Sequence, residues 1–69
     1  MNCVQDFLDN ADRARERGSY LFEQGNKSLD ENRPITYLAW RIPAEISMSE
    51  SRIFTGLAAI YKKLEGAGQ

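Results

Sequence analysis

Hydrophobic residues recur at helical spacing through the first third of the chain. On a helical wheel at about 100° per residue they fill an arc of about 140°, the width of a core-facing stripe. They are Val4, Phe7, Leu8, Ala11, Ala14, Gly18, Leu21 and Phe22. Gly25 and Asn26, which follow, form a typical helix stop signal. The pattern therefore predicts a helix over residues 3–24.

Residues 25–34 have turn chemistry throughout, and we expect a loop there. The next stretch, residues 34–42, is ambiguous. Ile35 and Ile42 match helical spacing, whereas the β-branched and aromatic content also suits a strand. No other segment offers a strand to pair with, so a strand here would need to pair across a dimer to satisfy its backbone groups. We favour a short helix that ends before Pro43.

A second long amphipathic pattern covers residues 48–65. Ser47 and Glu50 stand at capping-box spacing at its start. Its apolar positions fill an arc of about 160°, wider than one neighbouring helix covers, which predicts a further packing partner. They are Ile53, Phe54, Leu57, Ala58, Ile60, Tyr61 and Leu64. Residues 65–69 are glycine-rich, and we expect a frayed tail.

These elements predict an all-α fold in a single domain, residues 1–69: a small bundle of two longer helices and one short helix, completed by dimerisation. A chain of 69 residues buries only about 60% of its unfolded surface, and domains this small usually need a further stabilising device. One cysteine and no histidine exclude an internal disulfide and make a structural zinc site untenable. Self-association remains, and we expect a homodimer.

Net charge and composition restrict the classes of partner and the cellular compartment that we expect. A net charge of −1 and a pI near 5.3 differ from the basic excess of non-specific nucleic-acid binders. No apolar run approaches the length of a membrane span. The N-terminus has neither the basic start nor the apolar stretch of a signal peptide. Together with the single free cysteine, these features predict a cytoplasmic protein.

The sequence lacks the residues that usually carry out catalysis. There is no histidine, glycine-rich phosphate loop or metal-ligand cluster. Cys3 has no histidine to act as its base. Asp30 and Glu31 are adjacent carboxylates in a polar loop, unlike a general acid–base pair in an apolar site. We therefore expect no enzymatic activity, no cofactor and no bound metal.

A candidate interaction surface comes from residue types that are enriched at interface hot spots, above all Tyr, Trp and Arg. Its members are Arg15, Arg33, Tyr37, Trp40, Arg41, Phe54 and Tyr61. A helical segment 34–42 places Tyr37 and Trp40 opposite the Ile35 face, where a partner would contact them. Trp40 is alternatively the largest piece of the core. Arg15 lies within the apolar arc of the first helix and either extends to water or serves an interface.

The sequence thus predicts a small non-enzymatic protein that acts by binding a protein partner. Cytoplasmic chains that are this short and carry no identifiable motif resemble accessory proteins of bacteriophages and other mobile elements, which commonly bind one host protein. The alternative is a nucleic-acid-binding regulator with a helix-turn-helix-like pair, in which Arg33, Tyr37, Trp40 and Arg41 stack on bases or contact phosphates. Acidic residues beside nearly every arginine weigh against that alternative.

Overall fold

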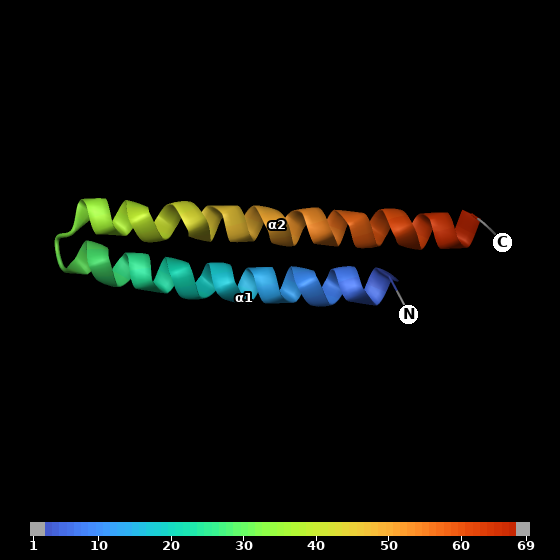
Figure 1. Ribbon diagram of the computed structural model, residues 1–69, viewed down its shortest axis with the longest axis horizontal. Helices are drawn as coiled ribbons and strands as arrows, with labels where there is room; N and C mark the ends of the chain where they lie inside the picture. Colours follow the sequence, from blue (N-terminus) through green and yellow to red (C-terminus); the bar gives the residue numbers. More distant parts are fainter. Residues whose placement is uncertain (1–2, 68–69) are drawn as a thin grey trace.

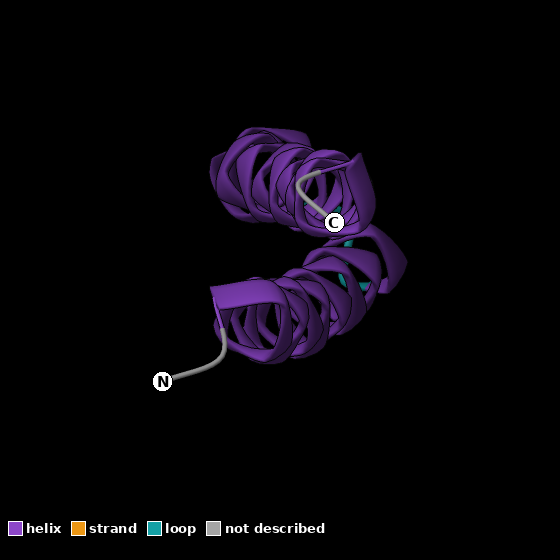
Figure 2. Cartoon of the chain, turned by 90° about the vertical axis from the view of Figure 1, so that its right-hand side faces the viewer, coloured by secondary structure: helices purple, strands orange, loops and turns teal. Residues whose placement is uncertain are grey.

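Two long antiparallel helices make up the protein (Figure 1). The computed structural model describes residues 3–67, with α1 spanning Cys3–Asp30 and α2 spanning Pro34–Ala67. The described chain measures 57 × 15 × 12 Å. Figure 2 views the hairpin from the end where α1 begins and α2 ends, with the two helices side by side. The predicted all-α class is confirmed: residues 3–67 contain two helices and no strand.

The turn between the helices, residues 31–33, ends α1 through two backbone hydrogen bonds. The amide of Arg33 donates to the carbonyl oxygen of Ser28 at 2.9 Å, and that of Asn32 donates to Leu29 at 3.0 Å. Asn32 has a φ of 62°, the left-handed conformation that asparagine tolerates better than most residues. This is a Schellman motif, with asparagine in the place where glycine is usual.

The predicted end of the first helix at residue 24 is wrong, because α1 continues through Gly25 to Asp30. Gly25 is buried and has a negative φ. A Cβ atom placed on it would lie 3.4 Å from the Cβ of Trp40 and 3.5 Å from the ring of Tyr37. The glycine therefore serves a close helix–helix approach instead of a turn, and the predicted loop 25–34 shrinks to residues 31–33.

The predicted break at Pro43 is also wrong, because α2 is one helix of 34 residues. The short helix 34–42 and the start at residue 48 merge into it. Proline removes one helical hydrogen bond, to the carbonyl of Ala39. Ala39 is exposed, so water can bond that carbonyl. Ser47, predicted as part of a cap, is instead a buried residue of the helix interior with 5% exposure.

Small residues at seven-residue intervals form the seam where the helices meet, the repeat of a coiled coil. They are Ala11, Gly18 and Gly25 on α1, and Ala44, Ser51 and Ala58 on α2. A Cβ atom on Gly18 would approach the side chain of Met48 to 3.1 Å and the carbonyl oxygen of Ala44 to 3.3 Å. The backbones therefore pack closely along the seam.

A seam of small residues gives the hairpin little core. The buried hydrophobic residues are four alanines, Ala11, Ala14, Ala44 and Ala58, and among the described residues no large side chain is fully buried. The predicted third helix is absent from residues 3–67. The structure contains one copy of the chain, so dimerisation stays a prediction. Residues 65–67 continue α2, and the rest of the predicted frayed tail, residues 68–69, lies outside the described residues.

Candidate interaction surfaces

A line of exposed branched side chains follows α2, and we call it the isoleucine stripe. Its members and exposed fractions are Ile35 84%, Ile42 58%, Ile46 54%, Ile53 61%, Ile60 55% and Leu64 60%. At helical spacing these six positions lie within about 20° of one line, which extends for about 43 Å. Isolated exposed hydrophobic residues are normal, whereas a continuous apolar patch marks an interaction site.

The stripe and the seam occupy opposite faces of α2. Trp40, Ala44, Ser47 and Ser51 face α1, and they lie about 150° around the helix from the stripe. α1 therefore covers one apolar face of α2 and leaves the other open. A helix that is apolar on two opposite faces normally lies between two neighbours.

Charged residues flank the stripe. Glu45 and Arg52 lie along one edge, seven residues apart, and Glu50 lies along the other edge. The carboxylate of Glu50 pairs with Arg17 of α1 at 3.4 Å. Glu45 pairs with Arg41 at 3.1 Å, with its side chain 57% exposed. The stripe is thus an apolar strip between charged margins, which is the layout of a helix–helix interface.

Tyr37 and Trp40 lie opposite the Ile35 face, as helical spacing places them, but they lie toward α1 and it is the Ile35 face that is exposed. Both aromatic residues are half-buried, and they pack over Gly25. Ile35 is 84% exposed. Of the two interpretations left open for Trp40, the structure supports a place in the contact between α1 and α2. The two rings lie toward α1 because Gly25 has no side chain, which leaves room for them at this end of the seam.

Arg41 is held within its own helix. Its Nη1 donates a hydrogen bond to the Tyr37 hydroxyl at 2.8 Å, and its Nε donates to Glu45 Oε1 at 3.1 Å. Its guanidinium carbon lies 5.7 Å from the centre of the Tyr37 ring. The hydrogen bond to Glu45, and then that to Tyr37, raises the pKa of Arg41 above its ordinary value. Arg33, in the turn, lies 3.8 Å from Glu31. These arginines already have acidic neighbours.

Phe54 and Tyr61 meet Phe7 of α1 at the open end of the hairpin. The ring centres of Phe7 and Tyr61 are 5.3 Å apart, and those of Phe7 and Phe54 are 6.3 Å apart. Phe7 and Phe54 are half-buried, and Tyr61 is 41% exposed. This cluster joins the two helices at the open end of the hairpin.

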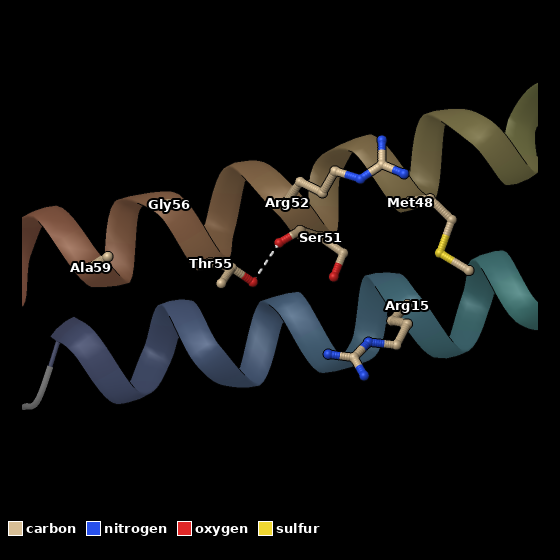
Figure 3. Close-up of a pocket in the computed structure, with 7 residues that line it drawn as sticks. All are labelled: Arg15, Met48, Ser51, Arg52, Thr55, Gly56 and Ala59. Carbon is tan, nitrogen blue, oxygen red and sulfur yellow. Dashed lines mark hydrogen bonds between the residues drawn. The ribbon is translucent and has the colours of Figure 1, made fainter.

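Arg15 lines a shallow groove between the helices near the middle of the hairpin (Figure 3). In the figure its side chain lies below α2, Met48 reaches toward α1, and Arg52 points away from α1. The other lining residues are Ser51, Thr55, Gly56 and Ala59. Arg15 is exposed, so its charge stays in water, as expected for an arginine that extends from an apolar face.

The seven predicted contact residues therefore do not form one surface. Arg33, Tyr37, Trp40 and Arg41 lie at the turn end, Arg15 at the middle, and Phe54 and Tyr61 at the open end. The wide apolar arc of residues 48–65 predicts a further packing partner, but the sequence pattern did not identify the stripe as a site, because the residues of the stripe occupy the spacing of core positions. The signal was present in the spacing of Ile46, Ile53 and Ile60 at seven-residue intervals, out of phase with the seam.

Other kinds of site find little support in the part of the chain that the structure describes. Residues 3–67 contain no cluster of three or more acidic, cysteine or histidine side chains suited to a metal ion. Cys3 is an exposed free thiol. Neither α1 nor α2, within those bounds, is apolar enough over a sufficient length to cross a membrane.

Comparison with known proteins returned no relative: no family model, no curated protein and no solved structure matches this chain.

Proposed function

We propose that this chain is a non-enzymatic protein-interaction module that acts by burying the isoleucine stripe of α2 against another helical surface. The observation that carries the proposal is the stripe itself, a line of six exposed Ile and Leu side chains from Ile35 to Leu64. Fully burying a large aliphatic side chain contributes about 1.5 kcal/mol or more of free energy relative to leaving it exposed. Much of this contribution is absent while the side chains of the stripe stay in water.

The shape of the hairpin supports the proposal. The described chain has a radius of gyration of 16.1 Å, whereas a compact domain of this length has about 11 Å. With four alanines as its buried hydrophobic residues, the hairpin has little internal stabilisation, and binding would add to it. The narrower expectation, an accessory protein of a bacteriophage or mobile element that binds a host protein, stays a prediction.

The alternative function, nucleic-acid binding, has weaker support. Arg17, Arg33 and Arg41 each lie beside a carboxylate at 3.1–3.8 Å. Arginines that bind phosphates need guanidinium groups that are not already paired with carboxylates, on a surface of net positive charge. A gel-shift assay tests the alternative: binding that weakens steeply with salt would favour it over the protein-interaction proposal.

Photo-crosslinking in the cells that produce the chain tests the proposal directly. A photoreactive amino acid at Ile53 is expected to give protein adducts of defined mass. The matched control is Tyr20 on α1, which is 56% exposed against 61% for Ile53 but lies away from the stripe. Equal labelling from both positions, or none from Ile53, would contradict the proposed function.

A further inference from the structure

We propose that the occupant of the isoleucine stripe is a second copy of this chain, packed with its α2 antiparallel to the first. This inference rests on the proposed function, because it names the partner of the same surface. It places α2 at the centre of the assembly, with one apolar face on its own α1 and the other on the partner's α2.

The surface area of the single chain fits this occupant. The chain exposes 5289 Å², whereas a folded monomer of 7.9 kDa typically exposes about 4,400 Å². The excess of about 900 Å² is close to the roughly 800 Å² that each partner contributes to a stable protein–protein interface. A second identical stripe of equal length supplies the matching surface.

The arrangement of the stripe accommodates a two-fold antiparallel pair. Its midpoint falls between Ser49 and Glu50. Alignment at that midpoint places Ile46 opposite Ile53 of the second copy, and Ile35 opposite Leu64. Every large side chain of the stripe then meets another apolar residue. Ser49 lies near the two-fold axis, where a small side chain allows close approach of the helices.

The charges at the margins are compatible with this orientation. In an antiparallel pair, residues on the same edge of the two stripes face each other, which brings Glu45 near Arg52 of the second copy, twice by symmetry, and opposite charges in such flanking positions favour a pairing. Glu50 faces Glu50 of the second copy across the two-fold axis, and each of these carboxylates is already paired with Arg17 of its own chain at 3.4 Å. A parallel pair in register would instead bring Arg52 near Glu50 of the second copy, so disulfide crosslinking decides between the two orientations.

Disulfide crosslinking tests both the occupant and its orientation. In a Cys3→Ser background, which removes the natural thiol, Ser49→Cys places the two thiols about 2 Å apart along the helix axis. Oxidation is expected to convert most of the chain to a covalent dimer. Ile60→Cys is the control for orientation, because the antiparallel pair separates its two thiols by about 30 Å, beyond the reach of a disulfide. It is expected to remain monomeric on a non-reducing gel, and efficient crosslinking through Ile60→Cys would overturn the antiparallel arrangement.

A second substitution ties the crosslink to the stripe. Ile53→Glu added to the Cys3→Ser, Ser49→Cys chain is expected to reduce crosslinking at least tenfold, whereas Tyr20→Glu, at similar exposure, is expected to leave it unchanged. Crosslinking that survives Ile53→Glu would place the self-contact elsewhere and overturn the proposal. Absence of any crosslink through Ser49→Cys, together with adducts to a different protein from the photoreactive residue at Ile53, would overturn the second copy as occupant while leaving the proposed function standing.

Discussion

The hydroxyl of Ser51 in α2 donates a hydrogen bond to the backbone carbonyl oxygen of Ala11 in α1, with an Oγ–O distance of 2.8 Å. Ser51 is 7% exposed, so this bond lies inside the seam. It requires the two backbones to approach closely, which the surrounding small residues allow. Side-chain hydrogen bonds in such a narrow interface set the relative register of the helices.

Replacing Ser51 with alanine is expected to lower the free energy of unfolding by about 0.5–1 kcal/mol. The lost hydrogen bond costs about 1 kcal/mol, and the higher helix propensity of alanine offsets part of it. Thr55→Ala is the matched control, because the Thr55 hydroxyl donates within α2, to the Ser51 carbonyl at 2.9 Å. Urea denaturation at one fixed protein concentration measures both. A larger loss for Thr55→Ala than for Ser51→Ala would contradict this role.

Enlarging a buried alanine of α1 beside the seam is expected to force the helices apart. Ala14 is 0% exposed, and Ala14→Leu inserts three additional heavy atoms where no space is free. Overpacking of this kind costs about 1–3 kcal/mol. Ala59→Leu, at an exposed position of α2, is expected to change the free energy of unfolding by less than about 0.5 kcal/mol. Similar stability for both variants would show that the helices leave space for a larger side chain beside Ala14.

Gly25→Ala distinguishes a helix interior from a helix end. In the middle of a helix with a negative φ, alanine is favoured over glycine by about 1 kcal/mol, and the contacts of 3.4–3.6 Å around an added Cβ are ordinary. The variant is therefore expected to be more stable by about 0.5–1 kcal/mol in thermal unfolding. Had α1 ended at this glycine in a left-handed conformation, the same change would destabilise the protein.

Gly18→Ala is the companion measurement. An added Cβ there meets Met48 at 3.1 Å and the Ala44 carbonyl oxygen at 3.3 Å, so Met48 has to shift. Its gain is expected to be smaller than that of Gly25→Ala, or negative. Equal gains at both glycines would indicate that the seam has the same width at both positions.

The aromatic cluster at the open end is expected to couple the two helices. A double-mutant cycle with Phe7→Ala and Tyr61→Ala is expected to give an interaction free energy of about 0.5–1.5 kcal/mol, the range for aromatic pairs at such distances. Strictly additive effects would indicate that the 5.3 Å ring contact contributes little to stability. Phe7→Ala paired with Tyr20→Ala, on the far side of α1, is the additive reference.

Local sequence patterns predicted helices over most of the residues that form α1 and α2, but they placed the ends of those helices wrongly. Gly25 and Pro43 are typical helix breakers, yet both lie inside helices, because the seam extends across them with the same seven-residue spacing. The packing of Trp40 and Tyr37 over Gly25 is a contact between distant segments, which no local pattern encodes. Asn32 ends α1 instead, by adopting a left-handed conformation that its side chain tolerates.

The candidate surface was harder to predict, for a related reason. Residues 34–64 carry two apolar faces, and periodicity alone does not say which one packs inside the chain. The large side chains of Ile35 and Ile42 suggested the core. The structure buries the face that carries the small residues Ala44 and Ser51, because they let α2 approach the small residues of α1 closely.

The absolute mass of the chain in solution, measured by light scattering behind a sizing column across a wide concentration range, tests whether the isoleucine stripe self-associates. We expect a particle of twice the chain mass of 7.9 kDa, which Ile53→Glu converts to the single chain. A wild-type chain that stays at 7.9 kDa at every concentration would contradict the self-association of the isoleucine stripe.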